Sequence, residues 1–521
     1  MIRFAGYTGV VFTLLVGIVA TVLADLVEPQ HLMIAGGVLP VIYGSALLAL
    51  HPTHQRIGRW PVIFYGVGAL FLFPWLVLRQ YFGGFSLSAL LYHMQEGVQE
   101  GMPAGTILPV LAGGVVVACL LHSVWFLFRR LPKAGAWLSF AATGLVAVNP
   151  FVQSAGMYAY FVVSGQEPRV LSDLAPVRVS QPSAGKNLVL IYLEGIEATY
   201  DKPDLFENAY QKIAQLAPEA LNFTGVAQMP LTAWTSAGLV ASQCGVPLVP
   251  RGFASRNRID NAQSYMPGVT CLGDVLTERG YVTEMFLGSD ASFAGKRSFL
   301  ETHGIGHIHD IDELIAGGAD DLGNWGVLDG QLLDATLDRL SELEQTDTPY
   351  FLSLLTVGTH GPAAELASEC RGEHTAIEQD DILEGVRCTA ELVSQFVKAA
   401  QDVVSAEDTL IVLLSDHLAH PKVSAYWDLS KFDRTNTFMV LGGGIAPGEV
   451  SKQGAMIDAF PTLLEMMDLP SDAHRAGLGV SLLSENPSWV EGQSDWLMRQ
   501  RLRMDADLVS HLWGGDQVAN D

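Results

Sequence analysis

The sequence predicts a two-part protein: five membrane-spanning helices followed by an α/β domain with a doubly wound, mostly parallel sheet. Two observations support this division. The first 163 residues contain five successive apolar runs, each close to the ~20 residues that a spanning helix needs. From residue 187 onward, short apolar runs typical of buried strands alternate with segments that suit helices. That alternation indicates a parallel sheet with helices on both faces.

The amino-terminal part is expected to be a membrane domain over residues 1–163. Basic residues gather before the first run, between the second and third, and between the fourth and fifth, so the positive-inside rule places the amino terminus in the cytoplasm. Five crossings then place the rest of the chain outside. A cleavable signal peptide would account for the first run alone, and a soluble protein with five buried helices is the other alternative. The runs are Phe4 to Leu23, Leu32 to Leu50, Pro61 to Leu78, Ile107 to Phe128 and Trp137 to about Val163.

Two connecting segments complete the predicted domain organisation. Residues 86–97 are too short and polar to cross a bilayer, and their apolar positions suit a helix lying at the outer interface. Residues 164–185 contain Pro168, Pro176 and Pro182 and are expected to form a linker. The outer domain would then occupy residues 186–521.

The charge of the chain lies mainly in this outer domain. The whole chain has 30 lysines and arginines against 55 aspartates and glutamates, and the part after Val163 has 23 against 51, a net charge of −28. So acidic a domain is not expected to bind nucleic acid. An anionic ligand would have to be held by a local basic or metal site.

Four of the five cysteines fall in the predicted outer domain. In an oxidising compartment an even number of cysteines predicts disulfides. Proximity favours Cys244 with Cys271 and Cys370 with Cys388, although sequence alone allows three pairings. No pair has the close Cys-x-x-Cys spacing of a structural zinc site.

Five strands and five helices are predicted in the outer domain. The strand candidates are apolar runs at 187–193, 281–287, 350–357, 409–414 and 437–441. Helices are expected at Leu205 to Leu216, Ser236 to Gln243, Gly326 to Leu343, Asp381 to Val404 and Ile457 to Met467. There is no internal repeat.

Acidic and imidazole side chains follow two of these strands directly. Glu194 follows the run ending at Leu193, and Asp416 and His417 follow the run ending at Leu414 and Ser415. Ligands of open α/β sheets bind at the carboxyl ends of the strands. We therefore expect Glu194, Asp416 and His417 to converge on one divalent cation.

Thr235 is the candidate nucleophile. It precedes a helix-compatible run, so it is placed at a helix amino terminus, where free N–H groups favour negative charge. A threonine hydroxyl becomes a good nucleophile only when a base or a metal ion removes its proton. The alternative is that Thr235 is only an N-cap, and Thr232 is a weaker rival for the nucleophile.

Three basic side chains are predicted near the same sheet edge. His360 follows the strand ending at Val357, and Lys296 and Arg297 follow the strand ending at Leu287. His360 could donate to a phosphate oxygen or move a proton, and the two cations could hold a phosphate or glycerol headgroup. Taken singly, each has an ordinary alternative as a solvated or structural loop residue.

These residues and their order resemble the group of lipoteichoic acid synthases and phosphoethanolamine transferases, which have an alkaline-phosphatase-like and sulfatase-like domain outside the membrane. Within that group the likeness is to the phosphoglycerol transferases of osmoregulated periplasmic glucans. The segments that carry it are Tyr192–Glu197, Trp234–Pro247, Cys271–Asp274, Phe293–Lys296, Thr356–His360, Ser415–His417 and Asp433–Asn436.

The resemblance implies a two-step transfer in the periplasm, at a bacterial inner membrane crossed several times. Thr235 would attack phosphatidylglycerol, release diacylglycerol and carry phosphoglycerol as an ester until a glucan hydroxyl accepts it. By the same likeness, the metal is manganese, magnesium or zinc. Its ligands would be Glu194, Thr235, Asp416 and His417, and the substrate would contact Trp234, Lys296, Arg297, His360 and Arg434.

One departure and three alternatives remain. The chain has Leu287 and Ala294 where lipoteichoic acid synthases have a histidine and a tryptophan, which leaves the headgroup contacts open. A phosphoethanolamine transferase would use the same catalytic residues. A sulfatase would need a Cys-x-Pro-x-Arg-like setting, which Cys244-Gly-Val-Pro247 does not match. A non-catalytic domain that senses a headgroup or glycan is the third alternative.

Overall fold

The computed structural model describes residues 163, 169–178, 185–250, 264–372 and 377–514. Every described helix and strand belongs to one compact unit made of Arg169–Val249 and Asn257–Asp521. The five predicted membrane helices, apart from Val163, and the predicted interfacial helix at 86–97 lie outside the described residues, as do parts of the 164–185 linker. Within the described ranges, no helix has both the length and the apolar character that crossing a bilayer requires.

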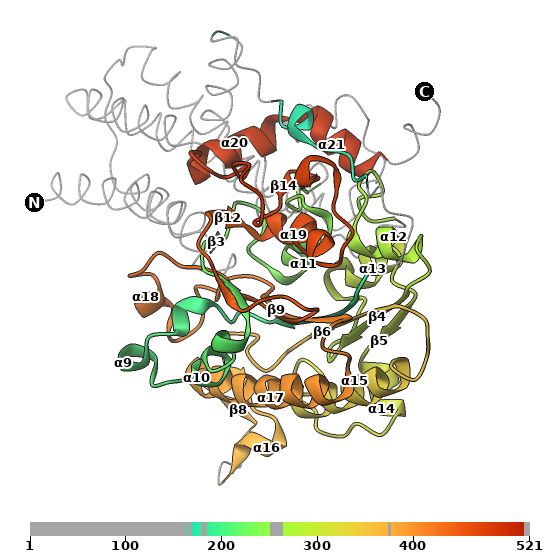
Figure 1. Ribbon diagram of the computed structural model, residues 1–521. Coiled ribbons are helices and arrows are strands. Elements are labelled where there is room, and N and C mark those ends of the chain that lie inside the picture. The colour runs from blue at the N-terminus through green and yellow to red at the C-terminus, as the bar shows by residue number, and fades with distance from the viewer. Residues whose placement is uncertain (1–162, 164–168, 179–184, 251–263, 373–376, 515–521) are drawn as a thin grey trace, which may run out of the picture. The chain divides into compact units, whose positions relative to one another are not determined.

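An eight-stranded sheet runs through the centre of this unit (Figure 1). All five predicted strands form, and those from β9 to β5 in the sheet order are parallel to one another. β10 runs antiparallel to both of its neighbours, so the sheet is mixed but mostly parallel, as predicted. In sheet order the strands are β11 Gly448–Val450, β2 Leu221–Phe223, β10 Phe438–Gly442, β9 Thr409–Ser415, β1 Asn187–Leu193, β6 Tyr350–Leu355, β4 Val282–Leu287 and β5 His307–His309.

Helices cover both faces of the sheet (Figure 1). One face is covered by α10 Gln211–Ala214, α14 Ile311–Ala316, α15 Asp329–Leu343 and α17 Ile382–Val403, and the other by α11 Thr235–Cys244, α12 Leu272–Thr277 and α19 Ala459–Met466. The apolar side chains of the central strands are buried on both faces, which explains why these strands read as continuous apolar runs.

The remaining elements are short. The other helices are α9 Pro203–Phe206, α13 Lys296–Thr302, α16 Ser368–Arg371, α18 Tyr426–Leu429, α20 Asp495–Met504 and α21 Ala506–Trp513. Three small two-stranded sheets pair β3 Val226–Ala227 with β12 Gly454–Ala455, β7 Ala364–Glu365 with β8 Glu378–Gln379, and β13 Arg475–Ala476 with β14 Gly479–Val480. Single 3-10 turns occur at Leu171–Asp173, Ala198–Tyr200, Ala217–Glu219, Phe293–Gly295, Met456–Asp458 and Asp472–His474.

One predicted helix is wrong, because the structure has two short helices in its place. The segment from Leu205 to Leu216 is divided into α9 and α10 because Glu207 and Asn208 have φ angles of 50° and 58°, in the left-handed region that a continuous helix excludes. The other four predicted helices form, with ends within a few residues of those expected. The helix predicted at Ile457 to Met467 begins as the 3-10 turn before α19.

Both disulfides favoured by proximity are present. Cys244–Cys271 joins the end of α11 to the residue before α12, and Cys370–Cys388 joins α16 to α17. The first disulfide therefore anchors the carboxyl end of the helix that begins at Thr235.

Candidate active site

The three predicted metal ligands meet at the carboxyl ends of β1 and β9. Leu193 pairs with Ser415 in the parallel register, so the chain leaves both strands side by side and places Glu194 beside Asp416. Glu194, Asp416 and His417 are 3%, 0% and 1% exposed, and one ligand atom from each lies within 4.8 Å of the others. The predicted convergence is therefore present in the structure.

Hydrogen bonds to the backbone hold these side chains in place. The backbone N–H groups of Gly195 and His417 both donate to Asp416 Oδ1, at 2.8 and 2.7 Å. The Thr359 hydroxyl donates to the Glu194 carbonyl, and the Glu194 N–H donates to the Thr356 hydroxyl at 3.0 Å. Gly195 has a φ of +60°, a conformation that glycine adopts without strain and that turns the chain back toward Asp416.

Two buried atoms at this position fit a bound cation. Asp416 Oδ2 and His417 Nε2 lie 3.3 Å apart, and within the described part of the chain neither makes a hydrogen bond. Buried polar atoms seldom lack a partner. His417 Nδ1 is 2.9 Å from the Leu418 carbonyl, which fixes its N–H there and leaves a lone pair on Nε2. A divalent cation bound by one nitrogen and two carboxylates would give both of these buried atoms a partner.

Without a bound cation, the three buried groups of the cluster shift one another's pKa. Burial, and then the neighbouring Glu194 carboxylate, raise the pKa of Asp416 to about 8. Burial opposes ionisation of Glu194 as well, but His360 and His417 hold the pKa of that carboxyl well below its usual range. Burial also opposes protonation of His417, yet Asp416 and Glu194 raise its pKa to about 9. Two carboxylates this close ionise together only when a positive charge lies between them.

Thr235 is the first residue of α11 and faces the cluster. Its hydroxyl donates to Glu194 Oε2 at 3.1 Å. The N-cap position belongs to Trp234, so the alternative in which Thr235 is only an N-cap is wrong. The hydroxyl of the rival Thr232 is fully buried and donates to the Met229 carbonyl at 2.8 Å.

A glycine lets α11 approach this close. A Cβ atom on Gly238 would lie 1.8 Å from the Asp416 carbonyl oxygen, so only glycine fits where the helix crosses the end of β9. The same helix is tied on its other side, because the Ser236 hydroxyl donates to the Ala294 carbonyl at 3.1 Å. These two contacts set the position of Thr235 relative to Glu194.

Of the predicted substrate residues, His360 reaches the cluster. Its Nδ1 lies 3.0 Å from Glu194 Oε1, and its ring packs against Trp325 with centroids 4.1 Å apart. Burial lowers the pKa of His360, but Glu194 outweighs this effect and the pKa is raised overall. Lys296 is buried at the start of α13, with its ammonium group 5.0 Å from the centre of the Phe293 ring.

The two predicted arginines are engaged in ion pairs. Arg297 contacts Asp310 at 2.5 Å and Glu301 at 3.7 Å. Arg434 pairs with the buried Glu197 and donates to the Ala419 carbonyl at 2.8 Å, so it braces the loop that follows His417. The substrate-binding roles of Trp234, Lys296, Arg297, His360 and Arg434 stay predictions.

Sequence reasoning missed three residues that support the site. Glu197 accepts the Ala419 N–H at 2.9 Å, and Gln228 accepts the Leu418 N–H at 2.7 Å, so both hold the loop after His417. Trp325 packs on His360 from a segment that lies far from it in the sequence. Only Glu197 had a signal, because it follows Glu194 by three positions in the quoted Tyr192–Glu197 segment.

Sequence comparisons relate this chain to known proteins. The sulfatase family model matches residues 186–469. Phosphoglycerol transferase I of Xanthomonas euvesicatoria is 35% identical over 434 residues, which cover 80% of this chain and 60% of that protein. Phosphoglycerol transferase I of Salmonella paratyphi B is 35% identical over 424 residues, covering 78% and 54%. The chain thus spans little more than half the length of these relatives.

A solved structure shows a similar fold. A protein of the alkaline phosphatase superfamily from Vibrio parahaemolyticus superposes with a TM-score of 0.50 at 22% identity, covering 61% of this chain and 75% of the other. The likeness confirms the predicted alkaline-phosphatase and sulfatase type of sheet domain. The sulfatase family model matches more than half of this chain, so the chain belongs to the sulfatase family.

Proposed function

We propose that this protein is a metal-dependent transferase that moves phosphoglycerol from phosphatidylglycerol to a periplasmic glucan. The single observation that supports it best is the hydroxyl of Thr235, which lies at a helix amino terminus, 3.1 Å from a carboxylate of the candidate metal site. The likeness to proteins named phosphoglycerol transferase I supports the choice of headgroup. The proposal includes attachment to the bacterial inner membrane by the five predicted helices, with this domain in the periplasm.

Glu194, Asp416, His417 and Thr235 would hold the cation, which is manganese, magnesium or zinc. When bound, it would lower the pKa of the threonine hydroxyl and neutralise charge on the phosphoryl group. The chain itself orients the nucleophile, since Glu194 accepts the hydrogen bond from Thr235. The free N–H groups at the start of α11 favour a phosphoryl group at the same place.

The proposed reaction has two displacements at phosphorus. In the first, a bond forms from Thr235 Oγ1 to phosphorus, the bond to the diacylglycerol oxygen breaks, and the threonine proton passes along the Glu194 carboxylate to His360. His360, 3.0 Å from Glu194, returns a proton to the departing diacylglycerol oxygen. In the second, a glucan hydroxyl attacks phosphorus and gives its proton to His360, the bond from phosphorus to Thr235 Oγ1 breaks, and a proton returns through Glu194 to the threonine oxygen. Dividing the transfer in this way replaces one difficult step with two easier ones.

The decisive experiment traps the first half of the reaction. Purified full-length protein is incubated with labelled phosphatidylglycerol or phosphatidylethanolamine separately, without acceptor, and is then examined by intact-mass and peptide analysis. We expect diacylglycerol from phosphatidylglycerol alone and an equal amount of phosphoglycerol on the peptide that contains Thr235. Release from phosphatidylethanolamine instead would identify the runner-up, a phosphoethanolamine transferase.

Matched threonine variants complete the test. Thr235→Ala should lose both the diacylglycerol and the modified peptide, whereas Thr232→Ala should keep both because its hydroxyl is bonded to the Met229 carbonyl. If Thr235→Ala still transfers the headgroup, the acceptor attacks the lipid directly and the nucleophile is wrong. If neither lipid is cleaved by the metal-loaded wild type, a headgroup-sensing domain is the better interpretation.

A further inference from the structure

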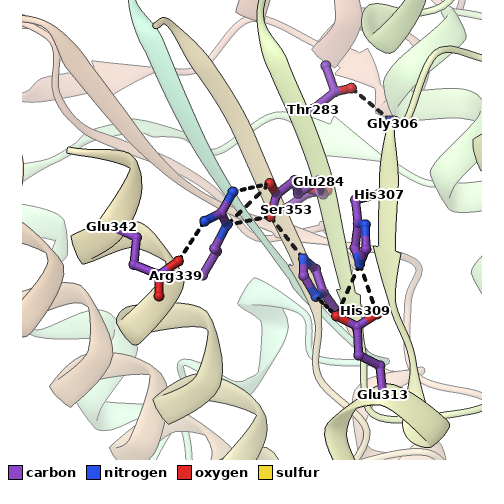
Figure 2. Close-up of polar contacts among 9 residues, drawn as sticks. All are labelled: Thr283, Glu284, Gly306, His307, His309, Glu313, Arg339, Glu342 and Ser353. Atoms are coloured by element: carbon purple, nitrogen blue, oxygen red, sulfur yellow. Dashed lines mark hydrogen bonds and ion pairs between the residues drawn. The ribbon is translucent and has the colours of Figure 1, made fainter. Parts of the chain in front are cut away.

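A second group of potential metal ligands lies at the opposite edge of the sheet from β11, on and beside strand β5 (Figure 2). His307 and His309 are two positions apart on this strand, so both project from the same face. Glu313, in the first turn of α14, points back toward them. In the sheet, β5 is separated from β1 by β4 and β6, so these residues are not part of the site around Thr235.

Three potential ligand atoms converge in this group. Glu313 Oε1 lies 2.6 Å from His309 Nδ1, and the two Glu313 oxygens lie 3.1 and 2.8 Å from His307 Nε2. These atoms all lie within 4.8 Å of one another. Two ligand atoms of a tetrahedral zinc ion are about 3.3 Å apart, given bonds of about 2.0–2.2 Å. Small movements of Glu313, whose side chain is 47% exposed, would therefore bring all three onto one ion.

The other ring nitrogen of His309, Nε2, contacts a buried carboxylate. His309 Nε2 contacts Glu284 Oε2 at 2.9 Å, and the buried Glu284 in turn accepts two hydrogen bonds from Arg339 Nε, at 3.2 and 3.0 Å, and one from Nη2, at 2.7 Å (Figure 2). A neutral imidazole has one N–H, so donation to Glu284 leaves a lone pair on Nδ1, facing Glu313 and His307. A carboxylate behind a histidine is the usual support of a histidine that binds metal.

The ring of His309 is also fixed in orientation. It stacks on Phe286 with centroids 4.0 Å apart and planes 17° apart. His307 and Glu313, by contrast, are 52% and 47% exposed, so this side of the group faces solvent. The site therefore has one rigid ligand, two adjustable ligands and an open side.

We propose that His307, His309 and Glu313 bind a divalent first-row transition metal ion, with zinc the best match, and leave a fourth position to water. Two imidazoles and one carboxylate suit zinc, copper or nickel, and do not suit magnesium or calcium, which prefer oxygen ligands. The bound ion ties the edge strand β5 to α14. This inference is independent of the proposed transferase activity.

Zinc retention by the full-length protein tests the site. Wild type and variants are dialysed against micromolar zinc and then analysed for zinc per chain and for melting temperature. Wild type should retain one more zinc than His307→Ala or Glu313→Gln, both of which alter half-exposed side chains. Zinc should raise the melting temperature of wild type. The increase should be smaller for His307→Ala.

Three further variants distinguish zinc bound at these three residues from zinc bound elsewhere on the protein. His474→Ala removes a half-exposed histidine that contacts Glu465 at 3.0 Å, and it should retain as much zinc as wild type. Asp416→Asn should keep the zinc that depends on His307, whatever happens at the proposed catalytic site. Glu284→Gln should weaken zinc binding about 10- to 100-fold through His309. Equal zinc content in wild type, His307→Ala and Glu313→Gln would overturn the proposal, as would an equal loss in His474→Ala.

Discussion

Replacing Gly238 with alanine should disable catalysis by moving the nucleophile. A Cβ atom at this position would lie 1.8 Å from the Asp416 carbonyl oxygen, whereas such contacts are essentially never below 3.0 Å. The helix and the strand end must therefore separate by the difference, about 1.2 Å. Both partners are backbone atoms, so no side chain can rotate to relieve the contact.

The displacement acts directly on the site because Thr235 begins the same helix and Asp416 is a proposed ligand. A misplacement of about 1 Å in an active site can cost about 100-fold in rate. Alanine would favour the helix by about 1 kcal/mol, but overpacking costs about 1–3 kcal/mol and prevails. We expect Gly238→Ala to release diacylglycerol from phosphatidylglycerol vesicles about 100-fold more slowly than wild type.

A second glycine supplies the control. In Gly448→Ala the new Cβ would be 3.6 Å from Leu221, an ordinary contact on the edge strand β11, and activity should be unchanged. Thermal melting of both variants separates loss of fold from loss of positioning. If folded Gly238→Ala works within about twofold of Gly448→Ala, the close approach of α11 does not position the nucleophile.

Three further predictions concern the metal, a disulfide and acid stability. Asp416→Asn keeps an oxygen for its two backbone N–H donors, so its metal-free melting temperature should stay near that of wild type. In wild type, a cation at 100 times its Kd should stabilise the folded state by about 2.7 kcal/mol, and Asp416→Asn should lose this stabilisation. If the cation raises the melting temperature of Asp416→Asn as much as that of wild type, Asp416 is not a ligand. Replacing Cys370 and Cys388 together with serine opens a loop of 18 positions and should lower the unfolding free energy by about 3 kcal/mol, so equal denaturation midpoints would contradict it. Burial opposes ionisation of Glu284, but His309 and Arg339 hold its pKa at about 2. Because this value lies below the unfolded value of 4.5, its stabilisation is present above pH 4.5 and is lost as the pH falls through 2. Melting temperatures should therefore fall more steeply in wild type than in Glu284→Gln across this range, and parallel curves would refute the pairing.

Much of the fold was predictable because parallel strands buried on both faces have a local signature. Continuous apolar runs predicted the strands that became β1, β4, β6, β9 and β10. Loops at the carboxyl ends of parallel strands lie along one edge of the sheet. That rule predicts from the sequence that Glu194, Asp416 and His417 lie together.

Local signals failed where the chain breaks a regular pattern. Glu207 and Asn208 interrupt a segment with good helical periodicity. Asparagine can adopt the left-handed region at a helix end, but glutamate gives no such signal. The helices α20 and α21 were not predicted, although Ser494 and Asp505 are residue types that cap helices and their side chains accept hydrogen bonds from Leu497 and Leu508 N–H. In each case the outcome depends on packing against other parts of the domain.

The sequence by itself determined which side chains would lie at the carboxyl edge of the sheet. The reason is that a run of apolar residues predicts a buried strand, and the residues that follow the run lie at the carboxyl end of that strand. Only the tertiary structure decided the contacts between segments that are distant in sequence. These include the approach of Gly238 to Asp416, the packing of Trp325 on His360 and the contact of Glu284 with His309. These contacts depend on strand order, register and helix position. Those features are set when the whole core packs together, so no single segment of the sequence determines them.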